Sequence, residues 1–223
     1  MDNKKKIFTN YFKNKNILIT GHTGFKGSWL SLILIILGSN VYGISNSKPK
    51  KKNVYTFIKS KLKKDYNCNI LNFDKTKKII EIVKPEIIFH LAAQSLVFKS
   101  YDEPKETFLT NSIGSLNILE ALRQTKLKTN IIMITSDKAY LNIEKKSGYK
   151  EIDKLGGKDP YSASKAAAEH VIDAYANSFF IKNKKIKIVT ARAGNVIGGG
   201  DWSNNRIVPD IINSWRSKKT LEV

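Results

Sequence analysis

Short apolar runs alternate along the chain with longer amphipathic segments. The runs have the length and residue types of buried strands, and the segments between them have the spacing of helices. The predicted strands are residues 16–20, 40–45, 66–71, 86–91, 130–135 and 185–191. The predicted helices are residues 25–38, a charged stretch that ends at residue 64, and residues 75–84, 104–126 and 161–181. Residues 1–15 are polar and rich in lysine, and we expect a short helix or a loose arm there.

Strands that alternate with helices predict a parallel sheet with helices on both of its faces. The predicted fold class is therefore α/β, with a doubly wound parallel sheet of the Rossmann type. Ligands of such sheets bind outside the carboxyl ends of the strands. Polar and small residues gather after the predicted strands, at positions 20–21, 45–46, 69, 91–94, 135–138 and 192–195. The sequence thus predicts one ligand site at this edge of the sheet.

Composition adds one unusual feature, a formal net charge of +20 in 223 residues. Only four of the 39 basic residues are arginine, so 39 − 4 leaves 35 lysines. Proteins that read nucleic acids usually use arginine with interleaved aromatic residues. Lysine is here spread along the whole chain beside abundant asparagine and isoleucine, so we interpret the charge as compositional and expect no nucleic-acid partner. A positive field would still attract a substrate that carries phosphates.

Cysteine content and hydropathy indicate the cellular compartment. Cys68 is the only cysteine, which excludes an internal disulfide and favours a reducing environment. The longest apolar run, residues 29–37, is far shorter than the roughly 20 residues that cross a bilayer. It also follows a glycine turn rather than the basic N-terminus of a signal peptide. We therefore expect a cytoplasmic protein without a membrane partner.

A glycine-rich turn joins the first predicted strand to the first predicted helix. Gly21, Gly24 and Gly27 have the spacing Gly-x-x-Gly-x-x-Gly. Glycines let backbone N–H groups approach a pyrophosphate at a helix N-terminus, where the helix dipole also favours an anion. The plainer alternative is a tight turn that needs small residues. The strand before the turn and the helix after it favour dinucleotide binding.

The second predicted strand lacks the acid that usually binds the adenosine ribose. Residues 44–48 read Ile-Ser-Asn-Ser-Lys. Asn46 or Ser47 can bond a ribose hydroxyl, and the neighbouring lysines can accept a 2′-phosphate. These residues therefore leave both NAD and NADP open.

Tyr161 and Lys165 lie four residues apart, on one face of a predicted helix. A free tyrosine, with a pKa of roughly 10, is a poor base at neutral pH. A neighbouring ammonium group and a positive nicotinamide favour the phenolate and lower this pKa. The spacing alone also occurs in ordinary amphipathic helices. Here it follows Thr135 and Ser136, whose hydroxyls can orient an alcohol, so it predicts a base that acts while a hydride leaves for the cofactor.

Five segments together resemble the extended short-chain dehydrogenase/reductases that act on nucleotide sugars, and more narrowly the CDP-glucose 4,6-dehydratase branch. They are residues 21–30, 90–97, 135–138, 156–165 and 191–202, and the resemblance covers nearly the whole chain. The first and last segments are specific to this branch. The resemblance implies NAD as the cofactor and the nucleotide sugar CDP-glucose as the substrate. It also implies a homodimer that pairs through residues 104–126 and 161–181.

The resemblance further implies a cycle without net redox change. Tyr161 removes the O4 proton of glucose while the C4 hydride passes to NAD. The 4-ketone makes the C5 proton acidic, water is lost across C5 and C6, and the hydride returns to C6. Asp137 is implied as the acid for the leaving hydroxyl, which requires burial that raises its pKa. Lys138 is either a base with a pKa well below ~10.4 or a group that orients Asp137 or the substrate, and both readings stay open.

The implied binding residues follow the strand ends. Ser136 and Lys165 join Tyr161, Asp137 and Lys138 in the implied catalytic set. The implied cofactor contacts are Gly21, Thr23, Gly24, Phe25, Gly27, Asn46, Asn69, Ile70, Leu91, Ala92, Ala93, Gln94, Tyr161 and Lys165. The implied substrate contacts are Gln94, Ser95, Ser136, Asn195 and Arg206, and no metal ligand is implied. We expect His90 to be a core histidine, Asn111 to bond the backbone near the site, and Arg192 to be structural.

Length is the main departure from this family, because the chain ends at residues 220–223, within the substrate-binding region. We therefore expect an NAD-binding catalytic domain in residues 1–195 and the start of an incomplete substrate-binding region in residues 196–223. Most of the smaller C-terminal domain would then be missing. One alternative is a dTDP- or GDP-sugar dehydratase or an epimerase, although Asp137 and Lys138 argue against an epimerase. The other is a truncated, non-catalytic NAD-binding module.

Overall fold

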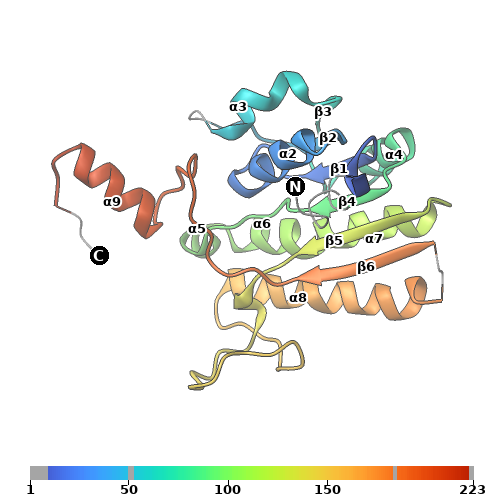
Figure 1. Ribbon diagram of the computed structural model, residues 1–223. Helices are drawn as coiled ribbons and strands as arrows, with labels where there is room; N and C mark the ends of the chain where they lie inside the picture. Colours follow the sequence, from blue (N-terminus) through green and yellow to red (C-terminus); the bar gives the residue numbers. More distant parts are fainter. Residues whose placement is uncertain (1–9, 50–52, 183–184, 221–223) are drawn as a thin grey trace.

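A computed structural model describes residues 10–49, 53–182 and 185–220, in which six parallel strands form one sheet with helices on both faces (Figure 1). The strands are β1 (Asn16–Thr20), β2 (Asn40–Ser45), β3 (Lys64–Asn67), β4 (Ile87–His90), β5 (Thr129–Ile134) and β6 (Ile186–Ala191). Their order in the sheet is β3-β2-β1-β4-β5-β6, so the winding reverses between β1 and β4. The predicted doubly wound α/β fold is confirmed.

Helices bury the sheet from both sides, which explains why the inner strands β1, β4 and β5 are largely apolar. Ile17 and Ile19 of β1 pack with Leu34 of α2 (Phe25–Ile36) on one face. Leu18, between them, belongs to the larger cluster on the opposite face. On that face α7 (Gly114–Gln124) packs against both α4 (Phe73–Val83) and α8 (Pro160–Tyr175).

The remaining helices are shorter or interrupted. They are α3 (Val54–Ile58), α5 (Val97–Asp102), α6 (Pro104–Phe108) and α9 (Ile207–Arg216). The predicted helix over residues 104–126 forms as α6 and α7, joined by a π-helical turn at Leu109–Ile113. A second π-helical turn, Ala176–Phe180, extends α8. Figure 1 shows α9 projecting from the body of the domain, and Pro209 is its only buried residue.

The predicted third strand, residues 66–71, is misplaced. β3 pairs residues 64–67 with residues 42–45 of β2, so it starts two residues before the predicted strand and overlaps only its first two residues. Asparagine side chains cause the early turn: the Asn69 side chain accepts from the Leu71 N–H at 3.0 Å, and Asn72 accepts from the Lys75 N–H at 3.0 Å and caps α4.

Other differences concern short helices. From residue 53 on, the charged stretch before β3 forms the short helix α3 and a 3₁₀ turn at Lys59–Lys61 in place of one longer helix. Helices α5 and α9 were not predicted. Most of the predicted N-terminal arm, residues 1–9, lies outside the described residues. Within the described ranges, none of the helices combines the length and apolar character needed to cross a membrane.

The close packing around Gly27 predicts that a side chain at this position destabilises the fold. A Cβ at this position would lie 2.2 Å from the Gly21 carbonyl oxygen. Because the clash is with backbone, Gly27→Ala should destabilise the fold by roughly 2 kcal/mol or more, measured by thermal or urea unfolding. Gly148→Ala is the matched control, since a Cβ there meets nothing within 4 Å. Equal losses of stability in the two variants would contradict this account.

Candidate active site

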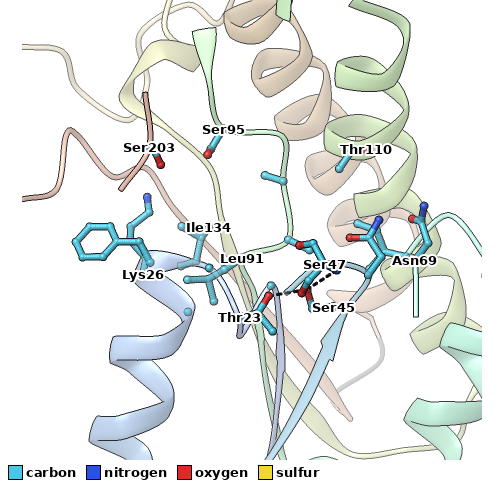
Figure 2. Close-up of a pocket in the computed structure, with 18 of the residues that line it drawn as sticks. Thr23, Lys26, Ser45, Ser47, Asn69, Leu91, Ser95, Thr110, Ile134 and Ser203 are labelled. Atoms are coloured by element: carbon cyan, nitrogen blue, oxygen red, sulfur yellow. Dashed lines mark hydrogen bonds between the residues drawn. The ribbon is translucent and has the colours of Figure 1, made fainter. Parts of the chain in front are cut away.

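Two adjoining cavities lie at the carboxyl ends of the strands. The first, of about 270 Å³, runs from the glycine turn to the ends of β2 and β3 (Figure 2). The second, of about 540 Å³, extends beside it toward α9. The two cavities share the lining residues Lys26, Ser95, Thr135, Tyr161, Asp201 and Arg206. They are therefore two halves of one site at the edge of the sheet that the sequence predicts.

The glycine turn forms one wall of the first cavity, and the five residues predicted there, Gly21, Thr23, Gly24, Phe25 and Gly27, all line it. Gly21 has φ +74°, and a Cβ on it would lie 2.8 Å from the Ala92 amide nitrogen. No side chain caps the first turn of α2, and that turn carries no acidic residue. The N–H groups of this helix end therefore face the cavity with a favourable dipole for an anion.

His22 fixes the turn against the neighbouring strands. Its buried ring packs over Gly43, where a Cβ would lie 2.3 Å from ring atoms. Its Nε2 lies 3.0 Å from Asp65 Oδ1, and the Tyr55 hydroxyl donates to Asp65 Oδ2 at 2.6 Å. Burial lowers the pKa of His22, while Asp65 opposes this shift. The sequence reading missed this link between the turn, β2 and β3.

Hydroxyl and amide groups line the end of the first cavity near β2 and β3. Figure 2 shows Thr23, Ser45 and Ser47 close together, and the Thr23 and Ser45 hydroxyl oxygens are 2.7 Å apart. Asn46, Asn69 and Ile70 line this end, as expected from their positions. Among the described residues, no carboxylate lines it, so recognition of a ribose here depends on neutral groups.

The loop after β4 supplies the next part of the wall. Leu91, Ala92, Ala93 and Ser95 line the first cavity, but Gln94 lines neither cavity. The Gln94 side chain instead donates to Thr107 Oγ1 at 2.9 Å and accepts from the Leu96 N–H at 2.7 Å. Asn111 accepts from the Gln94 N–H at 2.9 Å, which confirms its expected bond to backbone near the site. Gln94 thus braces the loop from within the protein.

Tyr161 and Lys165 both line the first cavity, and both are buried. Burial raises the pKa of Tyr161, against the opposing effects of a hydrogen bond with Ser136 and the charge of Arg206. The protein's own groups therefore do not produce the lowered tyrosine pKa that the sequence predicts. Burial, and next the charge of Lys26, lowers the pKa of Lys165 to about 8. Lys165 is thus still largely protonated at neutral pH.

Ser136, Asp137 and Lys138 follow β5; Ser136 and Lys138 line the second cavity, whereas Asp137 between them lines neither cavity. The Ser136 hydroxyl donates to Asp137 Oδ1 at 3.0 Å, and Lys138 Nζ lies 3.8 Å from the same oxygen. Lys138 Nζ also lies 3.5 Å from Asn195 Oδ1. The Asp137 side chain is 50% exposed, so the expected burial of this carboxyl group is wrong for the described residues. These contacts favour the orienting role of Lys138 over the role of a base.

Two further residues lie as expected. His90 is a core histidine: its Nδ1 is 2.8 Å from Thr20 Oγ1 and its Nε2 is 3.1 Å from Ser115 Oγ. Burial lowers the pKa of His90 to about 3. Arg192 pairs with the buried Glu169, with 3.0 Å between Nε and Oε1, which confirms its structural role.

Several lining residues were missed by the sequence reading: Lys26, Cys68, Thr110, Ile134, Asp201 and Ser203. The sequence could have indicated Lys26, because it is the one charged residue within the glycine motif. The others lie at ends of elements or in the loop before α9, where sequence spacing alone carries little information.

The sheet order, the glycine turn after β1 and the Tyr161–Lys165 pair together have the arrangement of a Rossmann-type short-chain dehydrogenase/reductase. Residues 18–207 match the family described as GDP-mannose 4,6 dehydratase. The chain belongs to this family. It is also similar to CDP-glucose 4,6-dehydratase of Salmonella typhimurium, with 42% identity over 220 residues that cover 96% of this chain and 61% of that protein.

Solved structures show the same fold. UDP-glucose 4-epimerase of Thermotoga maritima, determined with UDP-glucose, superposes with a TM-score of 0.80 at 26% identity, covering 93% of this chain and 65% of that one. UDP-glucuronic acid 4-epimerase of Bacillus cereus, in complex with UDP-glucuronic acid and NAD, gives 0.77 at 26% identity, over 92% and 64%. The chain thus spans slightly less than two thirds of the length of these proteins.

The lowered pKa of Lys165 predicts how the free energy of unfolding depends on this residue and on pH. Its pKa is about 8 in the folded chain and near 10.5 when unfolded, so the protonated form is disfavoured by folding. Lys165→Met should therefore stabilise the chain at pH 7, by something on the order of 1–3 kcal/mol. Between pH 8 and 10.5 the unfolded chain binds more protons, so the wild type gains stability and the difference should shrink. Unfolding midpoints measured from pH 7 to 10.5 test this; a destabilised variant at pH 7 would contradict it.

Proposed function

We propose that this chain is a nucleotide-sugar 4,6-dehydratase that converts CDP-glucose to CDP-4-keto-6-deoxyglucose. In this proposal, residues 1–195 are the NAD-binding and catalytic domain, and residues 196–223 begin the substrate-binding region. The 42% identity to a CDP-glucose 4,6-dehydratase carries the proposal. The position of Asp137 and Lys138 beside Ser136, with Tyr161 in the shared cavity wall, supports it.

The residues of the first cavity fit a nicotinamide dinucleotide. At Gly21 and Gly27 a side chain would clash with the protein's own backbone, so these glycines keep the turn tight, and the helix end that follows has no side-chain cap and lines the cavity. Ser45, Asn46 and Asn69 would hold the adenosine end, and Ala92, Ala93, Tyr161 and Lys165 the nicotinamide end. When bound, NAD supplies an acceptor for the C4 hydride and a donor for its return to C6.

The chain's own residues would manage the protons. Tyr161 takes the O4 proton, and Lys165, protonated at neutral pH, stabilises the phenolate that forms. Ser136, hydrogen-bonded to Tyr161 and Asp137, orients the sugar hydroxyl between them. Asp137 gives a proton to the C6 hydroxyl, which leaves as water, while the C5 proton passes to a solvent water in the second cavity and returns from solvent when the hydride is delivered to C6. Lys138 holds Asp137 and Asn195 in place from the other side.

The half-exposed Asp137 needs a drier environment to act as an acid. A sugar in the second cavity would exclude water from this carboxyl group, since the cavity wall includes Ser136, Lys138 and Asn195. In this proposal, substrate binding supplies the desolvation that the described residues do not. A sugar epimerase has no need of such an acid, so the pair at 137–138 favours the dehydratase over that alternative.

We further propose a cytoplasmic homodimer. The single cysteine, Cys68, supports a reducing compartment. Exposed apolar side chains along the two long helices support pairing between copies, namely Phe108 and Ile113 on one and Phe179 on the other. Light scattering should give twice the mass of the chain; a monomer mass at micromolar concentration would contradict the homodimer.

Mass spectrometry of the sugar product tests the reaction. The purified chain is incubated with NAD⁺ and CDP-glucose that carries deuterium at C4. The product should be lighter by one water and should retain deuterium, now at C6. Tyr161→Phe should slow the reaction by about 100-fold or more, because it lacks the base. Tyr11→Phe makes the same chemical change at an exposed position outside both cavities and should keep the wild-type rate.

The remaining outcomes separate the alternatives. Conversion of dTDP-glucose but not CDP-glucose would replace the proposed substrate. A change of configuration without loss of water would favour an epimerase. Binding of NAD⁺ without conversion of either sugar would contradict the proposed activity of this chain and favour a cofactor-binding module.

A further inference from the structure

Lys26 occupies the boundary between the two cavities. It lies in the first turn of α2 and lines both of them. In Figure 2 its side chain extends from the helix end into the space that Ser95 and Ser203 border. The residue is only partly exposed in this cleft, and within the described ranges no hydrogen bond or ion pair is found for its ammonium group. The Lys26 ammonium group is therefore available to a ligand in the cleft.

The charges around Lys26 are mostly of its own sign. Among the described residues, four cationic side chains line the two cavities, Lys26, Lys138, Lys165 and Arg206, against one lining carboxylate, Asp201. Asp201 is already 3.6 Å from Arg206, and the nearby Asp137 is 3.8 Å from Lys138. Lys26 and Lys165 are thus left without a carboxylate within ion-pair distance among the described residues.

Lys26 and Arg206 come from different elements, and both line both cavities. Lys26 comes from α2 and Arg206 from the residue before α9. Burial and then the charge of Arg206 lower the pKa of Lys26, and Asp137 opposes this, so the two cations are close enough to repel each other. Two neighbouring cations that line the same cavities are suited to bind an oxyanion.

We propose that the Lys26 ammonium group binds a diphosphate at the junction of the two cavities, together with Arg206. The inference rests on the proposed function for the nature of the anion, because both the dinucleotide and the nucleotide sugar carry a diphosphate. A diphosphate has two charged groups in one ligand, which suits a pair of cations from two elements at one cavity junction. It would offset the repulsion between Lys26 and Arg206 and leave Lys165 free to act on Tyr161.

In this proposal, the Lys26 side chain contributes to ligand selection in addition to the backbone of the glycine motif. Backbone N–H groups at the start of α2 can hold a phosphate whatever side chain follows Phe25. Lys26 adds a point charge directed away from that helix end, toward Ser95 and Ser203. A chain with a neutral residue here would keep the helix-end contacts and lose this additional charge.

Calorimetric titration with inorganic pyrophosphate tests the proposal on the full chain. The wild type should bind pyrophosphate at millimolar concentration or below, and Lys26→Met should weaken binding roughly ten-fold or more. Lys26→Arg should restore most of the affinity, since it keeps the charge. Lys78→Met is the matched control, because Lys78 is an exposed helical lysine outside both cavities. The unfolding midpoints should show that every variant is folded.

Two further titrations with NAD⁺ show whether the bound diphosphate belongs to the dinucleotide or to the nucleotide sugar. If pyrophosphate still binds the wild type saturated with NAD⁺, Lys26 holds the diphosphate of the nucleotide sugar. If NAD⁺ displaces pyrophosphate and Lys26→Met also weakens NAD⁺ binding, Lys26 holds that of the dinucleotide. Wild type that does not bind pyrophosphate, or Lys26→Met that binds it as tightly as wild type, would overturn the proposal. Lys26-dependent pyrophosphate binding without sugar conversion would instead count against the proposed reaction alone.

Discussion

The close approach of two backbone segments, the glycine turn after β1 and the loop after β4, is the constraint on which the site depends. Gly21 adopts a positive φ with no room for a Cβ beside Ala92, and the Ala92 N–H donates to Thr20 Oγ1 at 3.1 Å. Gly27 then sets the start of α2 against the same turn. This contact brings the helix end to the point where the sheet reverses, within the same cavity wall as Tyr161 and Lys165.

Charge is the second constraint on the site. Lys165 is buried with its pKa lowered to about 8, and Lys26 is a second cation nearby. A fold selected only for stability would not bury a lysine close to the charge of another lysine. Arg192 and Glu169 form a compensated pair behind the site, whereas Lys26 and Lys165 face the cavities. The excess of positive charge is therefore concentrated where phosphate-bearing ligands are proposed to bind. These cations lower the stability of the fold and would contribute to ligand binding.

Local sequence patterns predict most of the fold and the parts of the site that follow strand ends. Apolar runs mark β1, β2, β4, β5 and β6, and the residues after them, such as Gly21, Ala92 and Ser136, line the cavities. The prediction for β3 is misplaced because this edge strand reads Lys-Asp-Tyr-Asn and has no apolar run. The inward Gln94, the half-exposed Asp137 and the raised pKa of Tyr161 depend on packing between distant segments, which spacing along one chain does not report.

A crystal structure of the chain grown with NAD⁺ tests the central claim most directly. The account predicts the dinucleotide in the first cavity, with its diphosphate at the N-terminus of α2 and its nicotinamide beside Tyr161 and Lys165. The adenosine end should lie against Ser45, Asn46 and Asn69. A dinucleotide bound elsewhere, or bound with its nicotinamide at the end of β2 and β3, would contradict the assignment of this edge of the sheet as the active site.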